Sequence, residues 1–168
     1  DMLEWMMGDV ESVFAKMTTA LANVETEDTA IVTLKFKNGA LGIIEATTAT
    51  RPTNLEGSIS ILGKHGTVVV GGVAVNEMQT WVFEDEQEGD SNVLEEFSVN
   101  PPNVYGFGHQ AYYEHVVDCI VNGSANLVDG LQGRKSIELI SAIYESAETG
   151  KEVFLKFQPK HCRLGQKS

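Results

Sequence analysis

Hydrophobic and polar residues alternate through much of the first hundred positions, and this two-residue period predicts β-strands. The clearest example is residues 29–37, in which every second side chain from Ala30 to Phe36 is apolar. Asn38-Gly39 follows, and this dipeptide favours a type I′ turn, because both central residues of that turn need positive φ. The return strand is predicted over residues 40–50, so this part of the chain is expected to form a hairpin.

Weaker strand patterns precede and follow the hairpin. They predict strands at residues 9–22, 58–62, 67–70, 73–83, 97–99 and 153–157. The acidic run at residues 84–90 is too charged to pack in a core, and we expect it to be a solvated loop.

Apolar residues change to a helical period in two segments of the second half. The first helix is predicted within residues 105–123, closed by Gly123, which can take the left-handed conformation that ends a helix. The second is predicted over residues 131–148, where Asp129 and Gln132 have the spacing of a capping box. The two apolar stripes are Tyr113, Val116, Val117, Ile120 and Val121 in the first helix, and Ile137, Ile140, Tyr144 and Ala147 in the second. Strands followed by two helices predict an α+β domain whose sheet carries helices on one face.

Composition narrows the class of protein. The 168 residues can bury one core, and a net charge of −12 argues against binding to nucleic acid or to anionic membranes. No apolar run is long enough to span a bilayer, and the two cysteines form no disulfide framework, so a reduced cytoplasmic setting is expected. The chain begins at Asp1, and residues 1–7 already resemble the last turns of a helix, so we expect a piece cut from a longer chain.

Catalytic and metal motifs are weak. Residues 106–111 fit the dinucleotide pattern G-x-G-x-x-A, but prolines precede them and a second helix follows, whereas a nucleotide cradle needs a strand on each side. His109 and His115 are six positions apart and cannot bind one metal ion from the same helix face, so no metal site is expected. Cys119 is interpreted as a small buried hydrophobic residue. No complete catalytic apparatus is visible.

Three residues could contact a polar ligand. Tyr105 and His109 lie where an irregular segment enters a helix, a place where side chains and amides can meet a ligand. The alternative, favoured by composition alone, is that Tyr105 packs and His109 is an ordinary surface residue. Arg51, beside Pro52, could bind a carboxylate or phosphate, and it could equally be a surface arginine.

Several phrases, in their order along the chain, resemble the C-terminal domain of the glucose–fructose oxidoreductase / inositol dehydrogenase / rhizopine-catabolism (Gfo/Idh/MocA) family. They are residues 1–13, 38–42, 57–68 and 129–151. The resemblance implies a large, mostly antiparallel, open-faced sheet with helices packed on one face. It also implies that residues 1–158 form a substrate-binding and assembly domain and that residues 159–168 form a flexible tail.

In that family an N-terminal Rossmann domain binds NAD or NADP, and a lysine and a histidine act on the hydroxyl proton of a sugar or polyol. The resemblance implies that all of these precede Asp1 and are absent from this chain, which is then expected to bind no cofactor and to be inactive alone. Asp1 matches the acid three residues after that histidine, so its implied role is accessory: it orients the histidine or a substrate hydroxyl.

Residues 3–8 and 103–110 are most similar to members that oxidise UDP-linked N-acetylhexosaminuronates at the 3-position. By that analogy Arg51, Tyr105 and His109 are the candidate substrate contacts. The implied partners are a sugar or nucleotide sugar, the missing Rossmann domain, and a second copy bound through the open sheet face. The alternative is a free-standing, non-enzymatic oligomerisation or ligand-binding domain of the same fold, which a start codon just upstream of Asp1 would favour.

Overall fold

The computed structural model describes residues 1–73, 75–99, 101 and 105–156. The chain divides into two compact units. The first, which we call the four-stranded unit, is Asp1–Pro52 with Leu127–Ser168, and the second, the three-stranded unit, is Thr53–Asn126. The fold is α+β, as predicted, and every strand pairing within the two sheets is antiparallel.

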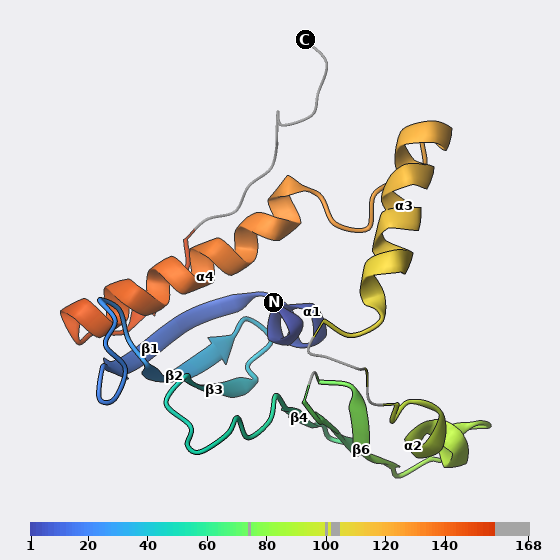
Figure 1. Cartoon of the computed structure of the whole chain (residues 1–168), viewed down its shortest axis with the longest axis horizontal. Helices are drawn as coiled ribbons and strands as arrows, with labels where there is room; N and C mark the ends of the chain where they lie inside the picture. The colour runs from blue at the N-terminus through green and yellow to red at the C-terminus, as the bar shows by residue number, and fades with distance from the viewer. Residues whose placement is uncertain (74, 100, 102–104, 157–168) are drawn as a thin grey trace. The chain divides into compact units, whose positions relative to one another are not determined.

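The four-stranded unit is a twisted sheet with one long helix along one face (Figure 1). The strands lie in the order β3-β2-β1-β7. The elements are α1 (Met2–Met7), β1 (Val10–Thr18), β2 (Thr29–Phe36), β3 (Leu41–Thr47), α4 (Gly130–Thr149) and β7 (Val153–Phe154).

The core of this unit lies between α4 and the inner face of the sheet. Its buried members are Val10, Val13, Ala15, Val32, Leu34, Phe36, Leu139, Ala142 and Ile143. The predicted inward face of β2 is thereby confirmed. In α4 the buried stripe differs from the one named from the sequence: Ile137 and Ile140 are exposed, while Leu139, Ala142 and Ile143 are buried. A helix with apolar residues on two sides can bury either stripe, and the stripe that packs against the sheet is the one that is buried.

The hairpin between β2 and β3 forms where predicted, but not with the predicted turn. Only Gly39 has positive φ, at 90°, so Asn38 does not satisfy the type I′ requirement. The Gly39 amide donates to the Phe36 carbonyl and the Phe36 amide donates to the Ala40 carbonyl, both at 2.9 Å. These bonds describe a type I turn followed by a left-handed glycine bulge.

The three-stranded unit contains the sheet β4-β5-β6 and three helical segments. Its elements are β4 (Ile59–Leu62), β5 (Gly66–Gly71), β6 (Glu77–Phe83), the 3-10 turn η1 (Asp90–Asn92), α2 (Val93–Glu96) and α3 (Gly108–Asn122). Part of the acidic loop is ordered by Asp90, whose carboxylate accepts from the Trp81 indole at 2.9 Å and the Gln87 amide at 2.7 Å. The strand predicted at residues 97–99 is reduced to a single bridge between Ser98 and Glu77.

Near the C-terminus, one prediction is confirmed and another falls outside the described residues. The last strand forms as β7, paired with β1. The boundary at residues 158 and 159 and the tail after it lie outside the described residues, so both stay predictions. Among the described residues, no helix has the length and hydrophobicity needed to cross a membrane.

Candidate functional site

Asp1 stands at the start of α1 and is bound by α4. Its carbonyl accepts from the Trp5 amide at 2.9 Å, which begins the helix. Its carboxylate oxygen Oδ1 accepts a hydrogen bond from the Ser136 hydroxyl at 3.0 Å. The candidate accessory acid is therefore oriented by a residue 135 positions away in the chain.

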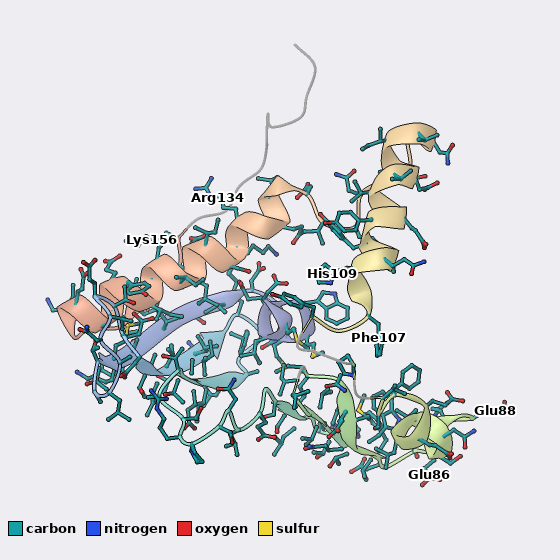
Figure 2. All side chains as sticks on the ribbon, viewed as in Figure 1. Glu86, Glu88, Phe107, His109, Arg134 and Lys156 are labelled. Carbon is teal, nitrogen blue, oxygen red and sulfur yellow. The ribbon has the colours of Figure 1, made fainter. Side chains whose placement is uncertain are left out.

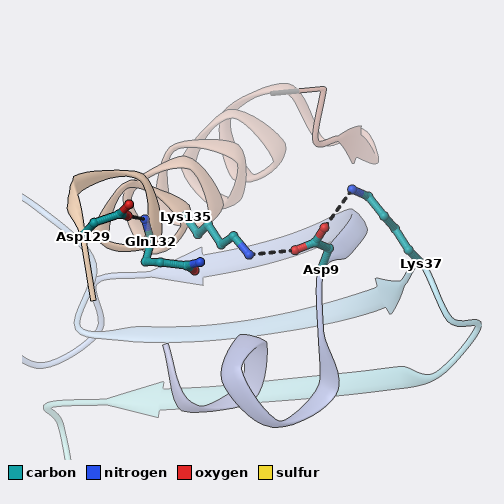
Figure 3. Close-up of polar contacts among 5 residues, drawn as sticks. All are labelled: Asp9, Lys37, Asp129, Gln132 and Lys135. Atoms are coloured by element: carbon teal, nitrogen blue, oxygen red, sulfur yellow. Dashed lines mark hydrogen bonds and ion pairs between the residues drawn. The ribbon is translucent and has the colours of Figure 1, made fainter. Parts of the chain in front are cut away.

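Asp9, just after α1, lies between two lysines (Figure 3). Lys135 of α4 donates to its Oδ1 at 3.0 Å, and Lys37 at the end of β2 donates to its Oδ2 at 3.2 Å. These two hydrogen bonds lower the pKa of the Asp9 carboxyl from its ordinary value. Asp9 thus remains a carboxylate that joins β1, β2 and α4.

Glu4 lies on α1 near the same lysine. Burial raises the pKa of its carboxyl, although the nearby Lys135 acts in the opposite direction. Its Oε2 is buried and has no hydrogen-bond partner among the described residues. A partly buried carboxyl of this kind is less costly when protonated than when charged.

Arg51 lies in the loop that leaves β3. Its Nη1 donates to the carbonyls of Thr50 at 2.7 Å and Thr48 at 3.3 Å. The loop is held in turn by Asp28, whose carbonyl accepts from the Thr48 amide at 2.8 Å. Both Arg51 bonds use Nη1, so the N–H groups on Nε and Nη2 are not committed to them. The guanidinium is exposed and can meet an anion.

Tyr105 and His109 are brought together at the entry to α3. Their rings meet edge to face with centroids 6.1 Å apart. Gly106 between them has a φ of 66°, which lets the backbone turn into the helix. Figure 2 shows His109 in the first turn of α3 and Phe107 just before the helix begins. The pair belongs to the three-stranded unit, and Arg51 belongs to the four-stranded unit.

The remaining chemical motifs do not form sites. The described residues contain no group of three or more His, Cys, Asp or Glu side chains that could hold a metal ion. Cys119 is not buried as predicted but half-exposed, and its Sγ lies 3.4 Å from Nε2 of His115. The i, i+4 spacing of these two residues could have predicted that contact.

The G-x-G-x-x-A stretch opens α3, and no strand occupies the described residues immediately before it. Within the part of the chain that the structure describes, there is thus no strand-to-helix turn here of the kind on which a dinucleotide pyrophosphate rests. The described residues of this stretch therefore do not fit a dinucleotide-binding site.

Sequence reasoning missed the polar contacts around α1. Ser136 and Lys135 lie in a phrase that carried the family resemblance, but no local pattern pairs them with residues 126 or 135 positions earlier. Their partners follow only from the tertiary fold.

Residues 1–155 match the model of the C-terminal alpha/beta domain of the Gfo/Idh/MocA oxidoreductase family. The chain belongs to this family, and its sheets and helices have the fold of that domain.

Three relatives illustrate the similarity. The structure of the WlbA dehydrogenase from Bordetella pertussis, in complex with NADH and UDP-GlcNAcA, is 43% identical with a TM-score of 0.85, covering 94% of this chain and 45% of that one. The WlbA dehydrogenase from Chromobacterium violaceum, in complex with the same two molecules, is 42% identical with a TM-score of 0.83, covering 94% and 44%. The D-apiose dehydrogenase of Rhizobium rhizogenes is 24% identical, covering 91% and 45%. The chain therefore spans less than half the length of each of these relatives.

Proposed function

We propose that this chain is the substrate-binding and assembly domain of an NAD(P)-dependent dehydrogenase that oxidises a UDP-linked N-acetylhexosaminuronate at its 3-hydroxyl. The observation that carries the proposal is the 43% identity, over 94% of the chain, to a dehydrogenase that binds NADH and UDP-GlcNAcA. The coarser assignment, an NAD(P)-linked sugar dehydrogenase, draws on the family match as well.

The proposed reaction removes two electrons from a secondary alcohol. The carbon-bound hydrogen leaves as hydride to the oxidised nicotinamide, the hydroxyl proton goes to a base, and a ketone remains. This chain supplies binding and orientation, while the cofactor cradle and the main proton-transfer groups belong to the segment that precedes Asp1. The chain alone is then inactive.

The proposed substrate contacts match the chemistry of the ligand. A UDP-hexosaminuronate carries a diphosphate and a carboxylate, and an exposed guanidinium such as that of Arg51 binds either group. Tyr105 and His109 offer an aromatic face and hydrogen-bonding groups to a sugar or base. The edge-to-face contact between their rings supports a role as a pair.

The full-length protein, including the coding sequence upstream of Asp1, tests the proposal. NADH formation should occur with UDP-GlcNAcA and be at least about tenfold slower with UDP-GlcNAc, which lacks the carboxylate. Arg51→Gln should raise KM about tenfold. Lys64 is an exposed cation in the turn after β4, and the control variant Lys64→Gln should leave KM unchanged. Turnover by the 168-residue chain alone, or an upstream sequence without a Rossmann domain, would contradict the proposal.

We also propose that two copies pair through the outer face of the four-stranded sheet. Register places Glu45, Ile31 and Lys16 in one row of this face, and Ile43, Thr33 and Phe14 in the next. Ile31 of the inner strand β2 and Ile43 of the edge strand β3 are 54% and 71% exposed, so this face carries exposed apolar side chains of the kind found at interfaces.

Charge favours a second copy as the occupant. The chain carries a net charge of −12, so two copies repel each other over most of their surface. The outer face is an exception, because Lys16 and Lys35 balance Glu11 and Glu45, and Lys35 pairs with Glu11 at 3.0 Å. A two-fold arrangement can set opposite charges against each other around the apolar centre.

Light scattering coupled to gel filtration tests the pairing. Ile31→Glu should convert a dimer into a monomer, because it places a charge at the centre of the contact. Ile140→Glu is the matched control, since Ile140 is 53% exposed on α4 and outside this face. A monomeric unmodified chain, or a dimer that survives Ile31→Glu, would refute the interface.

A further inference from the structure

α1 is too short to hold its own orientation. It has six residues and none of them is buried. A helix of this length is not stable in isolation. Leu3 and Met7 pack partly against the core, so the rest of its placement depends on contacts at its two ends.

Polar contacts hold both ends, and we call this set the α1 clamp. At the start, the Ser136 hydroxyl donates to the Asp1 carboxylate at 3.0 Å. At the end, the Asn38 side chain donates to the Met7 carbonyl at 2.9 Å. Just beyond it, Asp9 is bound by Lys135 and Lys37, as Figure 3 shows.

Two consecutive residues of α4 therefore reach opposite ends of α1. We propose that Ser136 and Lys135 are positioning residues: Ser136 sets the direction of the Asp1 carboxylate, and Lys135 fixes the far end of the helix through Asp9. The catalytic consequence rests on the proposed function, in which the chain enters this domain from the catalytic segment at Asp1.

The clamp acts on placement more than on stability. Its ion pairs are partly exposed, with side chains at Lys135 and Asp9 that are 42% and 48% accessible. Such pairs contribute little to the free energy of unfolding. A small displacement of a catalytic group, in contrast, lowers turnover strongly.

Amide hydrogen exchange on the 168-residue chain tests the clamp without any assay of activity. Ser136→Ala and Lys135→Met should each raise the exchange rate of the Trp5 and Gly8 amides, which close the two turns of α1, at least about fivefold. Ser141→Ala is the matched control, since its hydroxyl lies on the same helix and, among the described residues, bonds only the Ile137 carbonyl of that helix, at 2.8 Å. Exchange that matches the control in both variants overturns the clamp.

Kinetics of the full-length protein test the catalytic consequence. Ser136→Ala should lower kcat about tenfold with KM within about twofold, and it should cause no further loss when Asp1 is already alanine. An unchanged kcat, or the same loss in both backgrounds, overturns the positioning role while the proposed function stands. If the unmodified full-length protein oxidises no UDP-sugar, the proposed function fails and the catalytic role of Ser136 fails with it.

Discussion

The two long helices share an amphipathic pattern of apolar and polar residues, but they differ in how much of their surface is buried. α3 and α4 are both amphipathic, and both end at a left-handed glycine, Gly123 with φ 70° and Gly150 with φ 65°. α4 buries Leu139, Ala142, Ile143 and Ser146, whereas α3 buries none of its residues. Local sequence is thus enough to form each helix, but burial requires a sheet face for the helix to cover.

The same contrast separates the two units. Among the described residues, every buried hydrophobic side chain of the core belongs to the four-stranded unit. The three-stranded unit has half-buried contacts instead, such as the edge-to-face pair of Trp81 and Phe83 with centroids 5.0 Å apart. Most of the stability of this chain therefore comes from the contact of α4 with β1 and β2.

Core deletion should have the largest effect. Phe36→Ala removes a side chain with 0% exposure and should lower the free energy of unfolding by about 3–5 kcal/mol. Ile120→Ala, at a residue of α3 that is 78% exposed, should change it by less than about 0.5 kcal/mol. Urea denaturation followed by circular dichroism measures both. A large loss for Ile120→Ala would break the comparison, because it would mean that the apolar face of α3 is packed in solution.

Each unit holds a loop with an aspartate carboxylate, and the two aspartates differ in the hydrogen bonds that they accept. Asp28 is buried, and its Oδ2 accepts from three backbone amides, those of Leu21 at 2.7 Å, Ala22 at 2.8 Å and Ala20 at 3.0 Å. Asp90 accepts from one backbone amide and one indole. Asp28→Asn should therefore lower Tm by about 5 °C or more, and Asp90→Asn by about 2 °C.

The stabilisation by Asp28 should depend on pH, because it requires the ionised carboxylate. Hydrogen bonds from Ala22, Leu21 and Ala20 hold the pKa of Asp28 far below its usual range. The folded state therefore binds the proton less tightly than the unfolded state, and the stabilisation is present above about pH 4 and lost as pH falls. The difference in Tm between Asp28→Asn and the unmodified protein should shrink below pH 4 in thermal melts. A difference that stays constant down to pH 2 would show that the charge is not the cause.

The sequence predicted the local elements well. The hairpin, the inward face of β2, both long helices and the Asp129 cap follow from periodicity and from turn or capping residues. The Asp129 carboxylate accepts from the amides of Leu131 and Gln132, both at 2.9 Å. Figure 3 shows this cap beside the contacts of Asp9.

What the sequence could not predict depends on tertiary contact. Ser146 lies in α4 as an ordinary helical serine, yet it accepts from the Ala15 amide at 3.0 Å and donates to the Lys151 carbonyl at 2.6 Å. The Ser136–Asp1 bond is of the same kind. For the candidate site, the sequence placed Tyr105 and His109 at a helix entry but predicted no contact between their rings. The backbone contacts of Arg51 did not follow from any pattern either.

Glu4 should give the smallest effect and one of the opposite sign to Asp28. Burial raises the pKa of Glu4, so the folded state favours its protonated form. Its stabilisation is present below about pH 4 and is lost as pH rises through the raised folded value. Glu4→Gln should therefore raise Tm by about 1–2 °C at pH 7 and leave it unchanged at pH 3. Glu88→Gln in the exposed acidic loop controls for the lost negative charge, and an equal gain in both variants would assign the effect to net charge instead of burial.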